Sequence, residues 1–439
     1  MSIKKSISFT FGAQIINTLI AFVSSIIITR ILGAGGRGEY AIFTNAIAFA
    51  VLFFGFSITS TIAYFINSGK AKARELLTTI IVLAISSTIL VYGTLFLLQY
   101  FGALHLALSA RVQAEKYKLI FTAIYFSTLL SGIATAYLAA FKKFKVASFY
   151  GIGLQILTLI AYLLVYLDAV SYDHNNPFKT VVTITAFVAL ITLIAVIFLF
   201  LKVLYIKPSG KFIPVPLIKE FILFSSMAYI GNIATFFNYK LDFWVVDEYC
   251  GKSGLGIYSL ASQLSQLLWI LPQAISSVLY SYASSNQQES VRYTIQLKQL
   301  SFYGTLILGI TGLGLAYYFI PILYGKEFAG AYHLMMIFLT GVVPYSIPVI
   351  LASFFASRGN FKTSFVISLI TFAISLVLYF TLIPRYGLIG GAISSAIAYL
   401  LAAILSEIWF CKLYKVEAFN LFKIKKEMFS ISSITKKIL

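Results

Sequence analysis

Long apolar stretches separated by short polar stretches run through the whole chain. A membrane-spanning helix needs roughly 20 mostly apolar residues, and stretches of about that length occur twelve times. They lie at about 8–31, 40–66, 76–100, 117–141, 146–168, 180–205, 219–240, 254–283, 300–324, 329–356, 363–384 and 388–411. The pattern predicts an all-α integral membrane protein of about twelve transmembrane helices. The connections are too short to hold a folded extramembrane domain.

The chain also repeats itself at half its length. The segment LGAGGRGEYA at 32–41 aligns with CGKSGLGIYS at 250–259 at an offset of 218, which pairs Gly33 with Gly251. A second pair of segments aligns at an offset of 217: AYLAAFKKFK at 136–145 and SFFASRGNFK at 353–362. Two matches at nearly one offset, each between equivalent spans, predict two six-helix bundles in parallel orientation. Repeats of this kind typically flank a central substrate site.

This repeat sets the predicted domain organisation. We expect an N-terminal bundle, a cytoplasmic linker, a C-terminal bundle and a basic cytoplasmic tail, at residues 1–206, 207–218, 219–412 and 413–439.

The distribution of basic residues predicts the orientation of the chain. With a cytoplasmic N-terminus, 23 of the 33 Lys and Arg residues fall in cytoplasmic segments. Because Lys and Arg are enriched on the cytoplasmic side of membrane proteins, both termini are predicted to be cytoplasmic. The amino terminus has no small-residue cleavage site before or after its first apolar stretch, so we expect a retained span rather than a removed signal peptide.

Composition excludes several functional classes. The chain is 60% hydrophobic and only 11% charged, with a mean hydropathy of +0.93, whereas soluble domains carry about 25% charged residues. The net charge of +19 lies in loops and the tail, and no module resembles a nucleic-acid-binding domain. The two cysteines, Cys250 and Cys411, predict neither a disulfide nor a metal site. The glycine clusters lack the sequence of a phosphate-binding loop, so no cofactor is predicted.

Several predicted spans carry polar residues along one helical face. In the first, seventh and eighth spans these faces extend over most of the helix, and polar groups within a membrane tend to face a protein interior or a watery cavity. Small polar residues can also hold helices together in a dry interface, which is the alternative for each residue. We expect a hydrophilic cavity between the bundles, lined by Gln14, Asn17, Asn232, Gln263 and Gln266.

Charged residues near the spans sharpen this expectation. Arg30, Arg37 and Lys240 can contact a diphosphate, although the arginines can instead snorkel to the interface. Asp242 can carry a proton or a sodium ion, or can simply neutralise Lys240 or Arg30. Glu407, close to the cytoplasmic end of the last span, is expected to snorkel or to form a local pair.

With these residues in view, the chain resembles the polysaccharide transporter branch of the multidrug/oligosaccharidyl-lipid/polysaccharide flippase superfamily, especially the Wzx-type O-antigen flippases. Four segments carry the resemblance: TRILGAGGRGEYAIF at 29–43, NYKLDFWVVDEYCGKSGLGIYSLASQLSQLLWILPQAISSVLY at 238–280, LYGKEF at 323–328 and IPRYGLIGGAIS at 383–394. The resemblance implies two six-helix bundles that form a V around a central polar cavity. The implied substrate is an undecaprenyl-diphosphate-linked oligosaccharide, moved from the cytoplasmic to the outer leaflet of the cell membrane with the help of an ion gradient.

The resemblance also implies partners and leaves alternatives. The partners are the lipid-linked oligosaccharide and membrane lipids, with polysaccharide polymerase machinery left open and no nucleic acid. A cation-coupled multidrug exporter of the same superfamily is one alternative, although the first six spans lack an embedded carboxylate. The span count predicts a poor match to the fourteen-span lipid II flippases. A membrane-embedded polymerase or glycosyltransferase is disfavoured because the connections are short, so the chain is not expected to be an enzyme.

Overall fold

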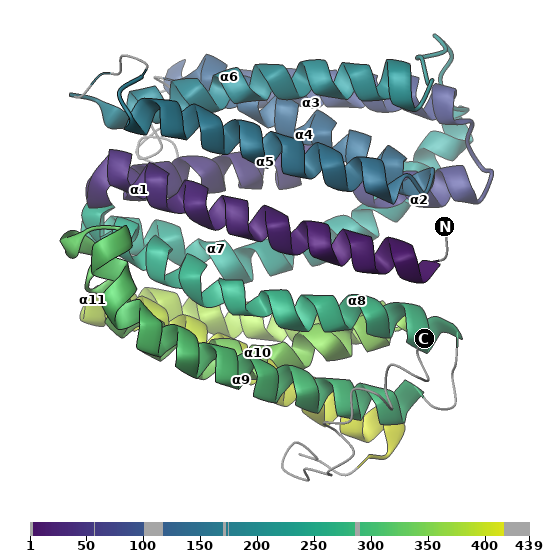
Figure 1. Cartoon of the computed structure of the whole chain (residues 1–439). Coiled ribbons are helices and arrows are strands. Elements are labelled where there is room, and N and C mark those ends of the chain that lie inside the picture. Colours follow the sequence, from purple (N-terminus) through teal and green to yellow (C-terminus); the bar gives the residue numbers. More distant parts are fainter. Residues whose placement is uncertain are drawn as a thin grey trace. The chain divides into compact units, whose positions relative to one another are not determined.

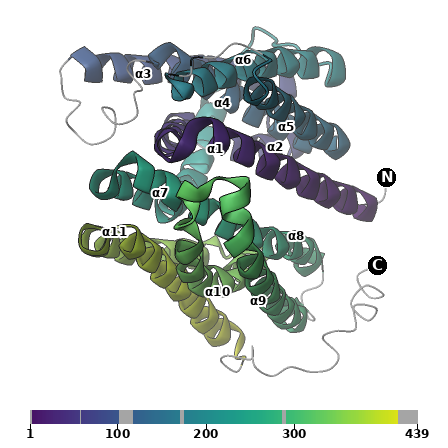
Figure 2. The same ribbon diagram turned by 60° about the vertical axis from the view of Figure 1, so that its left-hand side comes forward.

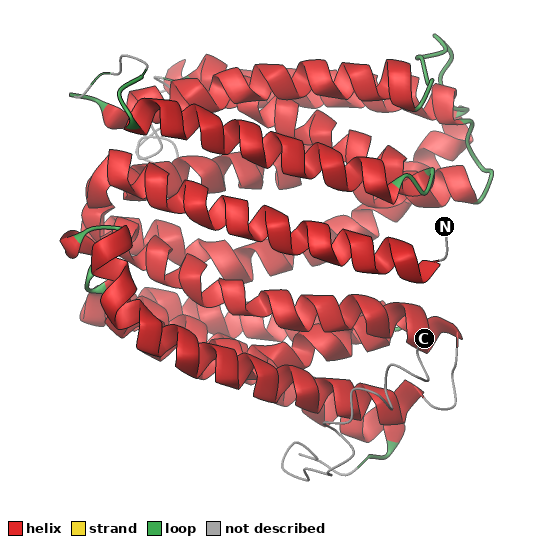
Figure 3. Cartoon of the chain, viewed as in Figure 1, coloured by secondary structure: helices red, strands yellow, loops and turns green. Residues whose placement is uncertain are grey.

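The computed structural model describes residues 3–56, 58–100, 117–169, 173, 175–285 and 290–416. Within these ranges the chain is helical and contains no strand (Figure 3). Eight of the described helices are long and apolar enough to cross a membrane. The prediction of an all-helical membrane fold is therefore confirmed.

The helices divide between two compact units. The first, here called the N-unit, comprises Ser8–Phe236, and the second, the C-unit, comprises Phe237–Leu439 together with Met1–Ile7. In chain order (Figures 1 and 2) the helices are α1 (Ile3–Gly55), α2 (Thr59–Asn67), α3 (Ala73–Tyr100), α4 (Lys118–Ala140), α5 (Phe144–Tyr166), α6 (Pro177–Phe198) with a π-helical turn (Leu199–Val203), α7 (Val215–Gln266) with a 3-10 turn (Leu267–Trp269), α8 (Ile270–Ser285), α9 (Ser290–Leu323), a 3-10 turn (Lys326–Phe328), α10 (Ala331–Ser357) and α11 (Phe361–Tyr414).

Three helices are long because each runs through a bend at a single glycine. The non-helical residues are Gly33 in α1 (φ 62°, ψ −177°), Gly251 in α7 (φ 68°, ψ 179°) and Gly387 in α11 (φ 55°, ψ −134°). Only glycine adopts such backbone angles without steric strain. Each bend, here called an elbow, separates two of the predicted spans, which is why twelve predicted spans correspond to fewer continuous helices.

Two predicted spans contain interruptions. The second is broken between Gly55, the last residue of α1, and Thr59, the first of α2. In the eighth, a 3-10 turn at Leu267–Trp269 precedes Pro272. Proline cannot donate a backbone hydrogen bond, and its ring clashes with the carbonyl four residues earlier. That carbonyl belongs to Leu268, so the tighter turn lies where the proline disturbs the α-helix.

The local geometry repeats as the sequence predicts. The aligned elbow glycines Gly33 and Gly251 have nearly the same backbone angles. The turn after α4 has Lys142 at φ 54°, and the turn after α10 has Gly359, its counterpart at an offset of 217, at φ 71°. Equivalent hydrogen bonds close both turns, from Lys143 N to Leu138 O (2.8 Å) and from Asn360 N to Phe355 O (2.9 Å).

The units divide inside α7, between Phe236 and Phe237. Residues 219–236, which the sequence assigned to the second bundle, thus lie in the N-unit. Contacts with α2 hold them there: Ser225 hydrogen-bonds Thr61 (3.1 Å), and the ring of Phe221 lies 5.1 Å from that of Phe65. The division of the chain into functional bundles at 207–218 stays a prediction.

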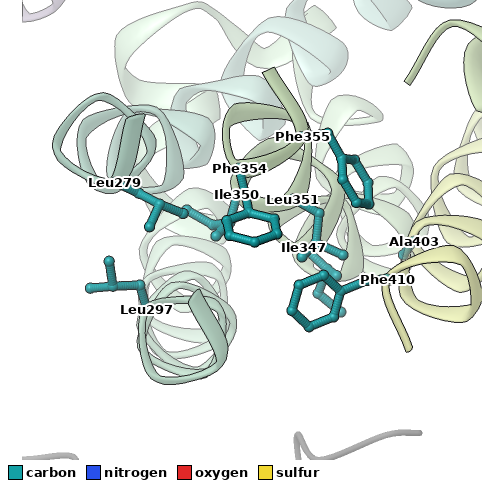
Figure 4. Packing of buried hydrophobic residues seen from close by; sticks show 9 residues of the cluster. All are labelled: Leu279, Leu297, Ile347, Ile350, Leu351, Phe354, Phe355, Ala403 and Phe410. Atoms are coloured by element: carbon teal, nitrogen blue, oxygen red, sulfur yellow. The ribbon is translucent and has the colours of Figure 1, made fainter. Parts of the chain in front are cut away.

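Each unit has a central helix. In the N-unit α4 packs against α2, α3, α5 and α6, and in the C-unit α10 packs against α8, α9 and α11. Figure 4 shows the apolar core around α10, in which Phe354 packs against Phe410 of α11 with ring centroids 5.5 Å apart. Leu279 of α8 and Leu297 of α9 complete this core.

Candidate functional site

The C-unit contains a buried carboxylate held by hydroxyl groups. Asp242 lies on α7 before the elbow at Gly251 and is 2% exposed. After the elbow the chain returns, so that the hydroxyl of Tyr258 donates to Oδ2 of Asp242 at 2.6 Å. Ser395 of α11 donates to the same oxygen at 3.3 Å, and the backbone N–H of Phe243 lies 3.0 Å from Oδ1. A buried charge needs such donors, because burial without them is very unfavourable.

A glycine on α11 makes room for this arrangement. A Cβ atom at Gly391 would lie 2.9 Å from the ring of Tyr258, closer than real side chains approach. The absence of a side chain at Gly391 therefore lets Tyr258 reach Asp242.

The hydroxyl cluster extends from Asp242 into α11. Tyr379 and Ser395 lie 3.3 Å apart at their oxygens, and Tyr379 also donates to the carbonyl of Asn238 at 3.4 Å. The Asn238 side chain donates to the Ser368 carbonyl at 3.0 Å. The two halves of α11 are thus joined to α7 by polar contacts around one carboxylate.

Lys240 lies next to this cluster but is oriented differently. Its ammonium group lies 4.6 Å from the centroid of the Phe243 ring, a distance at which a cation is attracted to the aromatic face. The hydrogen-bond donors to Asp242 are hydroxyls and a backbone amide. The hydrogen bonds to Asp242 thus come from neutral groups, and its neutralisation of Lys240 stays an alternative.

An aromatic cluster that the sequence analysis missed adjoins the site. Tyr239, Trp269, Tyr345 and Tyr399 come from α7, the 3-10 turn, α10 and α11, and every pair of these rings has centroids between 5.0 and 6.1 Å apart. The hydroxyls of Tyr239 and Tyr345 hydrogen-bond each other. Four aromatic residues on separate segments carry no local sequence signal of their proximity.

The predicted arginines lie in the N-unit. Arg30 is exposed, whereas Arg37 is 7% exposed and donates to the hydroxyl of Thr29 across the elbow at Gly33. Arg37 thus bonds the helix segment on the other side of its own elbow.

The five amide side chains predicted to line a cavity are distributed over both units. Gln14, Asn17 and Asn232 belong to the N-unit, and Gln263 and Gln266 belong to the C-unit. Gln14, Asn232 and Gln263 are exposed, and the other two are half-buried. Gln266 donates to Ser262 at 3.0 Å. Contact of these residues with water stays a prediction.

A buried ion pair lies between α9 and α11. Lys298 Nζ lies 2.6 and 2.7 Å from the two carboxylate oxygens of Glu407, and both side chains are almost fully buried. Glu407 was expected to snorkel or to form a local pair; it is instead buried and paired with a residue of another helix. Its partner was missed because the residues are 109 positions apart in the sequence.

Within the described ranges, no group of three or more His, Cys, Asp or Glu side chains could hold a metal ion. Among the described residues, the fully buried charged groups include the carboxylate of Asp242 with its hydroxyl donors and the pair of Lys298 and Glu407. These arrangements can stabilise or exchange charge within a membrane, whereas a nucleophile with an adjacent base, as covalent catalysis needs, was not identified among them.

Comparison with solved structures shows how widely this fold occurs. A lipid II flippase, MurJ, in an inward closed conformation has a TM-score of 0.73 at 16% identity, with 98% of this chain and 91% of that chain covered. An inward-facing multidrug resistance MATE family transporter of the MOP superfamily has a TM-score of 0.67 at 17% identity, with 92% and 96% covered. A MOP superfamily transporter from Pyrococcus furiosus has a TM-score of 0.62 at 16% identity, with 96% and 97% covered.

The first of these matches corrects one expectation. The span count predicted a poor match to lipid II flippases, yet the fold of one agrees over nearly the whole chain. Span count was therefore a poor guide to similarity of fold.

The family is shown by the sequence itself. No curated protein matches the sequence significantly. Residues 3–287, however, match the model of a family described as polysaccharide biosynthesis protein, and the helical units have the fold of MOP superfamily transporters. The chain is therefore a multi-pass membrane protein that belongs to the polysaccharide biosynthesis protein family.

Proposed function

We propose that the protein is a flippase that moves a polyprenyl-diphosphate-linked oligosaccharide from the cytoplasmic to the outer leaflet of the cell membrane. The product would supply O-antigen, capsule or exopolysaccharide synthesis. The observation that carries the proposal is the family match over residues 3–287, whose description is polysaccharide biosynthesis. The fold shared with a lipid II flippase supports movement of a lipid-linked substrate, and a flippase is a transporter rather than an enzyme.

The cargo has two parts with different chemistry, and the candidate residues suit both. A diphosphate requires cations, for which Arg30 and Lys240 are the candidates, with Arg37 buried against Thr29. The oligosaccharide requires hydrogen-bonding groups, which the exposed amides Gln14 and Asn232 would supply together with Gln263, Asn17 and Gln266. In a low-dielectric environment the attraction between a cation and a diphosphate is stronger than in water.

Asp242 is the candidate for coupling transport to an ion gradient. Its carboxylate is buried among neutral donors from Tyr258 and Ser395. A change in its charge would therefore change the hydrogen bonding of this cluster. In the aligned position of the N-unit, at an offset of 218, the chain has Ser24. The carboxylate is thus specific to the second repeat, which favours a functional role over one in packing.

The topology completes the proposal. With both termini cytoplasmic, the substrate would enter from the leaflet in which lipid-linked sugars are assembled. The test is a C-terminal fusion to a reporter that works only outside the cytoplasm. Activity of that reporter would reject this orientation.

A multidrug exporter is the second candidate, because a MATE family transporter shares the fold. The two functions are separated by one experiment in a strain that lacks its own oligosaccharide flippase. Complementation would be measured as surface polysaccharide and as lipid-linked oligosaccharide in each leaflet, and drug resistance would be measured in parallel.

In that strain we expect the protein to restore surface polysaccharide without raising drug resistance. Arg30→Gln and Lys240→Gln should reduce flipping about tenfold or more at unchanged protein abundance, since each removes a charge-assisted contact worth about 1.5–3 kcal/mol. The matched control is Lys326→Gln, which neutralises an exposed lysine in the turn after α9. Drug resistance without polysaccharide would favour the exporter, and full activity of both variants would reject their role.

A further inference from the structure

One end of the N-unit gathers exposed cations. At this end α2, α4 and α6 finish and α3, α5 and α7 begin. Nine basic side chains there are exposed: Lys70, Lys72, Arg74, Lys142, Lys145, Lys202, Lys207, Lys211 and Lys219. The described carboxylates at this end are Glu75, which pairs with Lys72 at 3.7 Å, and Glu220, which pairs with Lys70. We call this surface the basic ledge.

Specific contacts join the turns that form the basic ledge. Tyr137 near the end of α4 donates to the carbonyl of Ala73 at the start of α3 at 3.1 Å. Lys143, in the turn between α4 and α5, donates to the carbonyl of Val203 at 2.5 Å. The ring of Tyr137 also packs against that of Phe200, with centroids 5.2 Å apart. Basic residues from separate turns are thereby held on one surface.

The connection between α6 and α7 is fixed to this surface as well. Thr78 accepts a hydrogen bond from the backbone N–H of Ser209 at 3.0 Å, and Thr79 accepts one from that of Ile213 at 3.2 Å. Both threonines lie near the start of α3. Their hydroxyls accept hydrogen bonds from backbone N–H groups of the connection. Residues 204–213 therefore follow a defined path.

Along this path, apolar residues face inward and cationic or aromatic residues face outward. Leu204, Ile206 and Ile213 are at most 9% exposed, whereas Tyr205 and Phe212 are 73% and 55% exposed. Lys207 and Lys211 are exposed beside these rings. Amphipathic rings and long cationic side chains are characteristic of the headgroup layer of a membrane, where the rings meet the acyl boundary and the ammonium groups meet phosphates.

The opposite end of the N-unit has no such excess among its described residues. There the basic residues Arg30, Arg37, Lys118 and Lys179 are accompanied by Glu39, Asp168 and Asp173. The cationic surface is therefore a property of one end only, and that end is the one predicted to be cytoplasmic.

We propose that the basic ledge binds the phosphate headgroups of anionic phospholipids in the adjoining leaflet. These cations alternate with exposed aromatic rings along a backbone that is held in place. This arrangement suits a bilayer surface better than a soluble partner. Each lysine close to an anionic leaflet contributes about fivefold in affinity, converted from about 1 kcal/mol. This binding is independent of the proposed function, because bulk phospholipid is the ligand rather than the cargo.

The test uses the full chain in lipid nanodiscs that contain no lipid-linked sugar. Spin-labelled phosphatidylglycerol and spin-labelled phosphatidylcholine would report the association constant of each lipid with the protein. The variant combines Lys202→Gln, Lys207→Gln and Lys211→Gln, and the matched control combines Lys118→Gln with Lys179→Gln at the opposite end. We expect phosphatidylglycerol to be preferred by the wild type and the control, and the preference to fall at least about fivefold, the effect of one lysine, in the triple variant.

Two results would overturn the proposal. One is an unchanged preference in the triple variant, or an equal loss in the control, either of which would leave the lysines with the topological role that basic residues have in membrane proteins. The other comes from the wild type alone and does not depend on how the variants fold. Raising the salt concentration from about 0.05 to 0.5 M screens exposed charges, so a preference that does not fall over this range would exclude electrostatic binding. The triple Lys→Arg variant, which keeps the charge, should retain the preference.

Discussion

Two clusters of hydroxyl groups, one in each unit, occupy corresponding places in the repeat. In the C-unit the cluster contains Tyr258, Tyr379 and Ser395. In the N-unit, Tyr40 and Tyr162, which align with these tyrosines at offsets of 218 and 217, lie 3.4 Å apart at their oxygens. The hydroxyl of Tyr162 also lies 2.7 Å from that of Thr185 on α6.

The clusters differ in charge. Asp242 accepts hydrogen bonds in the C-unit cluster, whereas its aligned position in the N-unit is Ser24. The C-unit also contains the buried pair of Lys298 and Glu407. Hydroxyl groups therefore join helices at corresponding places in both units. The buried carboxylate of Asp242 is present at this place in the C-unit and absent from the aligned position of the N-unit.

The largest effect on stability should come from the charge pair of the C-unit. Lys298→Gln or Glu407→Gln alone leaves one buried charge without its partner, which costs about 3–5 kcal/mol. Thermal or denaturant unfolding in detergent would measure the loss. The double variant Lys298→Met with Glu407→Met should recover most of it, because replacing both charges by apolar groups is often neutral. A double variant as unstable as the single ones would contradict this account.

The aligned elbows at Gly33 and Gly251 should respond alike, which tests the repeat directly. Gly33→Ala and Gly251→Ala each place a side chain at a backbone conformation that is nearly exclusive to glycine, at a cost of about 1–3 kcal/mol. No neighbouring atom lies within 4 Å of the position of a Cβ at Gly251. Backbone strain is therefore the main cause of the expected loss of stability at Gly251. Gly153→Ala in α5, where nothing lies within 4 Å either, is the matched control and should be neutral or slightly stabilising. A large difference between the two elbow variants would break the equivalence.

The smallest change in stability should accompany Asp242→Ser, which gives the C-unit cluster the residue of its N-unit counterpart. Tyr258 keeps Ser395 as a neighbour, so we expect a loss of about 1 kcal/mol or less. Flipping should nevertheless be abolished or should stop responding to the proton or sodium gradient. The control is Ser24→Ala, which should leave the response to the gradient intact.

A double variant addresses the remaining structural explanation. If Asp242 only balanced Lys240, Lys240→Gln combined with Asp242→Asn should restore the transport that Asp242→Asn loses. We expect no restoration, and recovery of transport in the double variant would remove Asp242 from the coupling role.

Sequence reasoning located the features that depend on local pattern. The spans follow from apolar length, and the equivalence of Gly33 and Gly251 follows from a motif that surrounds both residues. It also identified Asp242 as unusual, since a carboxylate within an apolar stretch is visible without a structure. Its hydrogen-bonding partners were not predicted, because Ser395 lies 153 positions away and ordinary hydroxyl residues carry no pairing signal.

The packing of the first part of α7 could not be read from the sequence. Residues up to Phe236 pack in the N-unit, and the division into functional bundles at 207–218 stays a prediction. Hydropathy shows where a helix begins, but the helices against which it packs are set by side chains such as Phe65 and Phe221 that are distant in sequence.

The early part of α7 has a consequence for how the protein is made. Since residues as far as Phe236 complete the N-unit, this unit cannot finish folding when the sixth helix leaves the ribosome. It must wait for part of a helix whose other half belongs to the C-unit. Translation therefore delivers the two units in overlapping order, and a gene fragment that stops at the linker would encode an N-unit without the segment that packs against α2.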